Sequence, residues 1–389
     1  MKTKKKLVVI IFGGILLYLA SAGISFAAFR YLGKSVEIGP ISPLTEEQGH
    51  FKVDLSAPKT EKCPLNGSLF TKDERKIWEK RRPLTVMVEN HEEARPQSGL
   101  SRADIVYEAV AEGGITRFLA VYYCGASAQD VTIAPVRSAR IYYLDFASEY
   151  GDYPLYAHVG GANKPGPANA LGQIGDYGWL AKGNDLNQFS LSFPTFWRDY
   201  ERLSHPVATE HTMCSTTDRL WEVAQKRGLT DKDKNGNQWD ESFESWSFKD
   251  DEKLEKRGDV VKVNMEFWSD YQAYGVEWQY DRESNFYLRL NGGQPHKDLN
   301  NDEQLKAKVV IVQLTKEQGP VDNNKHLLYQ TTGKGKVIVF QDGEAIQGTW
   351  EKKDRESRTK FFDSQGKEIK LNRGPIWIEI VPARQKVNY

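Results

Sequence analysis

The strand-forming core of this chain is Arg82-Pro-Leu-Thr-Val-Met-Val-Glu-Asn-His91, followed by Ile105-Val-Tyr-Glu-Ala-Val110 and Phe118-Leu-Ala-Val-Tyr-Tyr123. Each segment is a short run of apolar and β-branched residues bounded by turn formers, which is typical of strands. Leu155-Tyr-Ala-His-Val159 repeats the pattern, and the segments 139–149 and 166–175 fit helices. This mixture of strands and helices predicts a mixed α/β domain over residues 80–230.

Beyond residue 259 the sequence changes to strands separated by tight turns. Val260-Val-Lys-Val-Asn-Met265 and Lys336-Val-Ile-Val-Phe340 are two of these strands, and Gln341-Asp-Gly-Glu344 places Asp-Gly after the second, a strong hairpin signal. The pattern predicts a mainly antiparallel β domain over residues 259–389. A connecting segment, 231–258, joins it to the first domain, and the expected fold class is α+β.

The first thirty residues indicate a membrane segment. Four lysines within residues 1–6 precede 23 uncharged residues, Leu7–Phe29, a length that spans a hydrocarbon core as one helix. The lysine excess before the apolar run predicts a cytoplasmic N-terminus and extracytoplasmic domains at the cell membrane. The alternative is secretion after cleavage of a signal peptide, because Ser25-Phe-Ala27 offers small residues to a peptidase. Residues 31–79, which contain four prolines, are expected to form a linker.

Charge and cysteine content restrict the partners. The chain carries 53 basic and 53 acidic side chains, so it lacks the positive field of a non-specific nucleic-acid binder. Export would place Cys63, Cys124 and Cys214 in an oxidising compartment, where neighbouring thiols tend to pair. We expect a disulfide between Cys63, in a loop before the first core strand, and Cys124, at the end of a strand. Three unpaired cysteines are the alternative.

Several longer motifs resemble a known family. They are Arg82 to His91, Ser98-Gly-Leu-Ser-Arg-Ala-Asp-Ile-Val-Tyr-Glu108, Glu112-Gly-Gly-Ile-Thr-Arg-Phe118, Pro135-Val-Arg-Ser-Ala-Arg140 and Ala157-His-Val-Gly-Gly161. Together these motifs are similar to the signature of the YerB-like lipoproteins, and Gly348 to Ile380 resembles the C-terminal domain of that family. The resemblance covers nearly the whole chain from Cys63 onward. It implies a two-domain protein of the bacterial cell envelope and leaves the activity open. A cysteine for lipid attachment directly behind the apolar run is missing here.

Two arginines mark the first candidate site. Arg137 and Arg140 lie where a strand is expected to end and a helix to begin, so backbone N–H groups and guanidinium forks would gather there. Ser138, Asn90 and His158 complete the predicted ligand-binding set, because Gly160-Gly161 behind His158 allows close approach. The pattern favours an anion site. The alternative is that both arginines pair with Glu108, Glu112 or Asp145 inside the fold.

Glu89, Glu112 and His158 are the candidate catalytic residues, with His211 as a second candidate histidine. Carboxylates at strand ends can act as acid and base or hold a divalent ion, although they more often neutralise arginines. The order of Pro135–Arg140 and His158–Gly161 also resembles the LytR-CpsA-Psr wall-polymer ligases, which implies binding of a polyprenyl diphosphate. Two functions therefore stay open. One is binding of an anionic glycan, peptide or lipid headgroup, and the other is phosphoryl or glycosyl transfer, or hydrolysis, on cell-wall polymers.

One stretch suggests calcium as the single cofactor. Asp231-Lys-Asp-Lys-Asn-Gly-Asn237 carries oxygen ligands at alternate positions, with Gly236 at the sharp turn of an EF-hand-type loop. Ser242 stands where such a loop has its last glutamate. The sequence predicts a calcium site at Asp231, Asp233, Asn235 and Asn237, with a solvated polar turn as the alternative.

Overall fold

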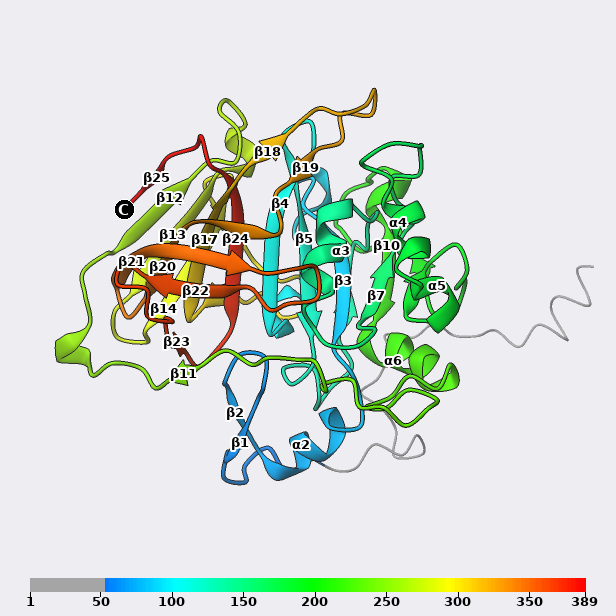
Figure 1. Ribbon diagram of the computed structural model, residues 1–389, viewed down its shortest axis with the longest axis horizontal. Helices are drawn as coiled ribbons and strands as arrows, with labels where there is room; N and C mark the ends of the chain where they lie inside the picture. Colours follow the sequence, from blue (N-terminus) through cyan, green and yellow to red (C-terminus); the bar gives the residue numbers. More distant parts are fainter. Residues whose placement is uncertain (1–52) are drawn as a thin grey trace, which may run out of the picture. The chain divides into compact units, whose positions relative to one another are not determined.

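A ten-stranded mixed sheet runs through both predicted domains in the computed structural model, which describes residues 53–389 (Figure 1). Its strands, in order across the sheet, are β22 (Lys360–Asp363), β21 (Glu344–Lys352), β20 (Gly333–Gln341), β17 (Val309–Thr315), β24 (Ile376–Pro382), β4 (Ile105–Glu112), β5 (Ile115–Tyr122), β3 (Leu84–Glu89), β7 (Leu155–His158) and β8 (Asp185–Asn187). The first five come from the C-terminal segment of the chain and the last five from the N-terminal segment. The two segments therefore share one sheet.

The junction between the two segments is a pair of parallel strands. β24 pairs with β4 in a register that sets Ile376 opposite Ile105 and Glu379 opposite Glu108. Every residue of β24 is buried, and so is every residue of β4 before Glu112. Such continuous burial is typical of strands covered on both faces. The last long strand of the chain thus completes the sheet that β3, β4 and β5 begin.

A second, antiparallel sheet covers one face of the first. It contains β15 (Gln294–Pro295), β14 (Phe286–Asn291), β13 (Val276–Asp281), β12 (Lys262–Met265) and β25 (Val387–Asn388), and β16 (Lys306–Ala307) also pairs with β14. Alternate residues of β13 are buried, which indicates that one face of this sheet packs inward. Trp278 of β13 donates from Nε1 to Oε1 of Glu379 at 2.9 Å. The second sheet therefore packs on the side of the first sheet from which Glu379 projects.

Helices cover the other face and one end of the long sheet (Figure 1). They are α2 (Lys72–Trp78), α3 (Ile141–Ala147), α4 (Ala170–Asp176), α5 (Trp179–Lys182) and α6 (Thr217–Lys226). Phe146 of α3 stacks on Tyr107 of β4, with ring centroids 5.0 Å apart. Tyr107 and Glu108 are neighbours on one strand, so their side chains leave on opposite faces. This part of the sheet is a middle layer between α3 and the second sheet.

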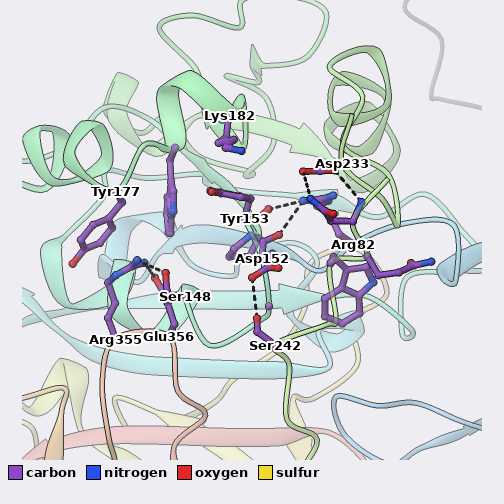
Figure 2. Close-up of a pocket in the computed structure, with 16 residues that line it drawn as sticks. Arg82, Ser148, Asp152, Tyr153, Tyr177, Lys182, Asp233, Ser242, Arg355 and Glu356 are labelled. Carbon is purple, nitrogen blue, oxygen red and sulfur yellow. Dashed lines mark hydrogen bonds and ion pairs between the residues drawn. The ribbon is translucent and has the colours of Figure 1, made fainter. Parts of the chain in front are cut away.

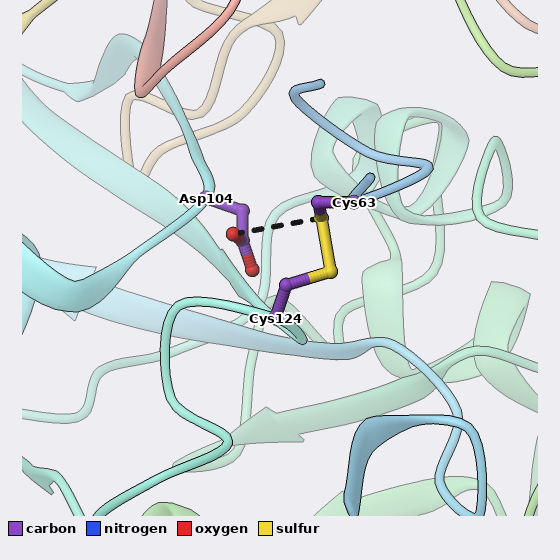
Figure 3. Close-up of side chains that lie close together, drawn as sticks. All are labelled: Cys63, Asp104 and Cys124. Atoms are coloured by element: carbon purple, nitrogen blue, oxygen red, sulfur yellow. Dashed lines mark hydrogen bonds between the residues drawn. A yellow bond between two sulfur atoms is a disulfide. The ribbon is translucent and has the colours of Figure 1, made fainter. Parts of the chain in front are cut away.

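The described part of the predicted linker is folded. Residues 61–78 form β1 (Glu61–Lys62), β2 (Leu69–Phe70) and α2, whereas we expected a linker up to residue 79. Thr71 and Glu74 form a capping box that begins α2, and Trp78 is buried. Cys63 forms the predicted disulfide with Cys124, which ties this segment to the end of β5 (Figure 3). The proline content led us to expect a linker, but residues 61–78 form a short ordered segment that the disulfide crosslinks to the domain.

The Asp-Gly hairpin forms as predicted. Asp342 and Gly343 have φ angles of 52° and 71°, and Gln341 pairs with Glu344 across the turn between β20 and β21. Positive φ at both central residues is the conformation that a two-residue hairpin of this kind requires. Shorter pairings complete the described fold: β6 (Thr132–Ile133), β10 (Met213–Thr216) and β9 (Trp197–Arg198), then β11 (Phe248–Lys249) with β23 (Leu371–Asn372), and β18 (Glu317–Gln318) with β19 (Leu328–Tyr329).

The predicted membrane helix, Leu7–Phe29, lies outside the described residues. Within residues 53–389, every helix is too short or too polar to cross a membrane.

Candidate functional site

Three predicted site residues end neighbouring strands at one edge of the long sheet. β3 and β4 run in the same direction, because each pairs antiparallel with β5 between them. β7 runs parallel to β3. Glu89, Glu112 and His158 are the last residues of β3, β4 and β7. Their strands therefore deliver all three side chains to the same edge.

The segment 135–140 lies across this edge. The N–H of Arg137 donates to Met87 O at 2.8 Å, and the N–H of Val159 donates to Arg137 O at 3.1 Å. The N–H of Ala139 donates to Gly160 O at 2.9 Å, and Gly160 has a φ of 56°, which favours glycine. These bonds fix the segment between the ends of β3 and β7. Both predicted arginines and the predicted glycine turn are thus brought together.

Glu89 joins Arg137 to His211. Its Oε1 accepts from Arg137 Nε at 2.9 Å, and its Oε2 lies 2.8 Å from His211 Nδ1. Burial raises the pKa of Glu89, but the hydrogen bond from His211 and the charge of Arg137 outweigh it, and the net pKa is lowered. The same hydrogen bond raises the pKa of His211. Glu89 is therefore a buried, ionised carboxylate held between two donors.

Glu112 joins Arg117 to Arg140. Arg140 donates to its Oε2 from Nε at 2.8 Å and from Nη2 at 2.6 Å, and Arg117 donates from Nη2 to Oε1 at 3.1 Å. Burial raises the pKa of Glu112, but the two guanidinium charges outweigh burial and lower the pKa to about 2. Arg117 also donates from Nη1 to the carbonyl of Ser138 at 3.0 Å. Both arginines are buried and committed to Glu112 in this arrangement.

His158 is fully buried and bonded at both ring nitrogens. Nε2 lies 2.7 Å from Asp185 Oδ1 of β8, and Nδ1 lies 2.7 Å from Gly160 O. In this arrangement the ring holds β7, β8 and the glycine turn together. Neither nitrogen is left for a ligand or for proton transfer.

Asn90 belongs to a different cluster. Its amide donates to Thr116 Oγ1 at 2.7 Å and to Glu108 Oε1 at 3.2 Å, and its oxygen accepts from Asn291 of β14 at 2.8 Å. These partners lie between the long sheet and the second sheet. The structure therefore brings Asn90 to the sheet interface and not to Arg137.

The strand-end cluster is defined as Glu89, Glu112, Arg117, Arg137, Arg140 and His211. Arg117 was in neither the predicted ligand-binding set nor the catalytic set, and His211 was named only as a second candidate histidine. Arg117 lies in β5, and its one signal in the sequence is that it is a charged residue within an apolar run. His211 lies 122 residues from Glu89 in the chain, and its position follows from the pairing of β10 with β6 and β9. Only the tertiary structure brings His211 to the edge.

The predicted calcium loop borders a separate cavity of about 400 Å³ (Figure 2). Tyr153, Pro154 and Asp233 line this cavity, which lies at the N-terminal end of β7 and not at the strand-end cluster. Asp233 Oδ1 accepts from the N–H groups of Asn235 at 2.8 Å and Asn237 at 3.1 Å. Its Oδ2 accepts from the Asn237 amide at 3.3 Å, so calcium would have to displace this last contact.

Calcium binding at Asp231, Asp233, Asn235 and Asn237 stays a prediction. We expect a dissociation constant of about 10⁻⁴–10⁻³ M, the range of extracellular modules, because the loop lacks its last glutamate. Calorimetry with calcium should detect it, and Asp231→Ala should remove it. Asp302→Asn, at an exposed aspartate outside the loop, is the control and should bind like the parent. A parent chain without any calcium response would identify the loop as a turn alone.

Comparisons with known proteins agree with the fold. Residues 69–230 match the family model described as "Protein of unknown function (DUF3048) N-terminal domain", and residues 263–378 match the corresponding C-terminal domain. The chain is 30% identical over 326 residues to "Putative lipoprotein YerB" of Bacillus subtilis (strain 168), which covers 82% of this chain and 86% of that protein. A crystal structure of YerB protein from Bacillus subtilis matches with a TM-score of 0.66 at 26% identity, covering 85% of this chain and all of that one. The chain therefore belongs to the YerB-like family of DUF3048 proteins, as its sequence motifs indicated.

Proposed function

We propose that this chain is an extracytoplasmic protein of the cell envelope that is held at the membrane by its N-terminus and binds an anionic envelope ligand at Arg137. The name of the Bacillus relative, "Putative lipoprotein YerB", supports the envelope placement. The lysines before Leu7–Phe29 support a single membrane pass with a cytoplasmic N-terminus. Cleavage near Ala27 would leave the same domains outside the membrane.

The guanidinium group of Arg137 is only partly paired with other residues. Its Nε pairs with Glu89, its side chain is 25% exposed, and its two Nη groups bond to no other residue in the range 53–389. A guanidinium with two free donors can grip a phosphate or carboxylate at two points, which lysine cannot imitate. Arg137 is thus the member of the strand-end cluster that is equipped to bind an external anion.

The charge balance of the cluster favours an anion as well. Three guanidinium groups, of Arg117, Arg137 and Arg140, face two carboxylates, of Glu89 and Glu112. These five groups alone carry one excess positive charge, at a partly buried edge where charge is less screened than on an open surface. Arg117 and Arg140 are buried, so Arg137 is the one of these three guanidinium groups that solvent can reach.

The charge state of the carboxyl groups and the hydrogen bonds of His158 favour binding over catalysis on wall polymers. The pKa values of Glu89 and Glu112 are both lowered, so neither carboxyl is set up to donate a proton near neutral pH. His158 has a protein partner at each ring nitrogen. The ligand chemistry that fits is a phosphate or carboxylate group, as carried by an anionic glycan, a peptide or a lipid headgroup.

Arg137→Lys tests this function. We expect phosphate to raise the melting temperature of the parent protein, and the variant to bind phosphate more weakly by about 1–3 kcal/mol, because lysine keeps the charge and loses the fork. Without phosphate the variant should melt like the parent, since lysine can still pair with Glu89.

The matched control is Arg373→Lys. The side chain of Arg373 is 26% exposed and pairs through Nε with Asp250 at 2.7 Å. Neither residue belongs to the strand-end cluster. The Arg373→Lys variant should show the same rise in melting temperature with phosphate as the parent protein. A parent protein that ignores phosphate and sulfate, together with a lower melting temperature of Arg137→Lys in plain buffer, would mean that Arg137 only neutralises Glu89.

A further inference from the structure

Two histidines and a glutamate meet at the strand-end cluster, to which one of them, His211, belongs. The rings of His91 and His211 stack with centroids 4.8 Å apart and an angle of 20° between their planes. Glu93 Oε2 lies 3.7 Å from His211 Nε2. One potential ligand atom from each of the three residues lies within 4.8 Å of the others. His91 and Glu93 lie outside the strand-end cluster as defined above.

Local structure explains why these residues meet. His91 lies two residues after the end of β3 and caps the short turn Glu92–Ala94, in which the N–H of Glu93 donates to the His91 ring. His211 ends the short turn Thr209–His211 just before β10. His211 is buried, His91 is half-buried and Glu93 is 61% exposed. The group therefore has a rigid inner side and one adjustable ligand facing solvent.

Glu89 orients His211. Its Oε2 lies 2.8 Å from Nδ1 of the ring, and its Oε1 is fixed by Arg137. When Nδ1 donates its proton to this carboxylate, Nε2 presents a lone pair on the side of Glu93. A histidine whose second nitrogen donates to a carboxylate is the usual arrangement behind a metal ligand, because it fixes the tautomer and the ring orientation.

We propose that His91, Glu93 and His211 bind a divalent transition metal ion of the zinc class. Glu89 positions His211 and does not itself bind the metal. Two imidazoles and a carboxylate suit zinc, whereas calcium and magnesium prefer oxygen ligands alone. Three protein ligands leave at least one coordination position for water or for an anionic ligand.

The site needs only a small closure to hold such an ion. Metal–ligand distances near 2.1 Å imply about 3.4 Å between ligand atoms in a tetrahedral site. The pair of His211 Nε2 and Glu93 Oε2, at 3.7 Å, is already close to this spacing. Ligation by His91 would replace the hydrogen bond that its Nδ1 accepts from the Glu93 N–H, which is long at 3.3 Å. The exposed side chain of Glu93 can make the remaining adjustment.

Zinc and cobalt titrations of the full-length protein in detergent, without any histidine tag and after treatment with a chelator, test the proposal. We expect one zinc ion per chain, a higher melting temperature with zinc, and visible absorption bands of cobalt in a low-symmetry nitrogen and oxygen environment. Glu93→Gln should weaken zinc binding by about 10–100-fold or more, since even the loss of a supporting partner behind a ligand has an effect of that size. His91→Ala should do the same.

Glu92→Gln is the matched control, because Glu92 is an exposed carboxylate one residue away. It should bind zinc like the parent, and so should Asp233→Ala in the calcium loop. Glu93 is exposed, so its replacement should leave the fold intact, which the melting temperature without metal will verify. Equal zinc affinities of Glu92→Gln, Glu93→Gln and the parent would overturn the proposal, as would a parent chain that binds no zinc. The result with zinc is independent of the phosphate response of Arg137→Lys.

Discussion

Arg289→Ala is expected to lower the free energy of unfolding by about 3–5 kcal/mol, because it would leave two buried carboxylates without their cation. Arg289 of β14 donates from Nη1 to Glu379 Oε1 at 2.9 Å and from Nη2 to Glu108 Oε2. All three side chains are fully buried. They connect the second sheet to β4 and β24, so the loss should fall on the contact between the two sheets.

Urea denaturation of the parent and the variant measures this effect. Arg384→Ala is the control, because Arg384 also pairs with a buried glutamate, Glu317, but is itself 55% exposed. Because Arg384 is exposed and Glu317 keeps the donors Trp268 and Tyr329, that pair should contribute no more than about 1 kcal/mol. If Arg289→Ala costs as little as Arg384→Ala, the buried ion cluster does not hold the sheets together.

Removal of the disulfide is the second large effect that we expect. Cys63 and Cys124 are separated by 61 residues. Closing a loop of that length stabilises the folded state by about 4 kcal/mol on the chain-entropy model. The double replacement Cys63→Ser and Cys124→Ser should lose that amount in urea denaturation.

A reductant provides the control for the disulfide. It should destabilise the parent by a similar amount and leave the double variant unchanged. In the double variant Cys214 is the remaining cysteine of the chain, so no other disulfide can form within it. Equal stability of the parent with and without reductant, with the bond shown to be reduced, would contradict the expected contribution.

Asp104 lies beside this disulfide and shows how tightly the segment is built (Figure 3). Its carboxylate accepts from Asn66 Nδ2 at 3.0 Å and from the N–H groups of Tyr123 at 2.7 Å and Gly125 at 3.0 Å. Burial raises the pKa of Asp104 to about 7 in spite of these hydrogen bonds. The buried carboxyl, together with the crosslink, fastens residues 63–66 to the end of β5.

The strands of the long sheet could be predicted from local pattern, but their order could not. Ile105 to Val110 and Ile376 to Ile380 are both apolar runs interrupted by one glutamate, Glu108 and Glu379. That interruption is a visible signal of a buried charge, because an isolated carboxylate in an apolar strand needs a partner. The pairing of these two strands, and the choice of Arg289 as their partner, depend on contacts between distant parts of the chain.

The candidate site was predictable to a similar extent. Because Glu89, Glu112 and His158 each lie at or near the end of a predicted strand, they could be expected at one edge of the sheet once the strand directions were known. The pairing of Glu112 with Arg140 agrees with one alternative considered for the arginines, and the pairing of Glu89 with Arg137 was not foreseen. Asn90 is next to Glu89 in the chain, yet it points to the opposite face because side chains alternate along a strand.

A crystal structure of this protein with phosphate would show whether Arg137 binds an anion, because it locates the anion itself. We expect a phosphate whose oxygens lie about 2.7–2.9 Å from both Nη groups of Arg137, with the ion pairs of Glu89 and Glu112 intact. Crystals of Arg137→Lys under the same conditions should show this position without phosphate. Phosphate bound elsewhere, with the guanidinium of Arg137 paired with Glu89 alone, would show that Arg137 is not the anion site.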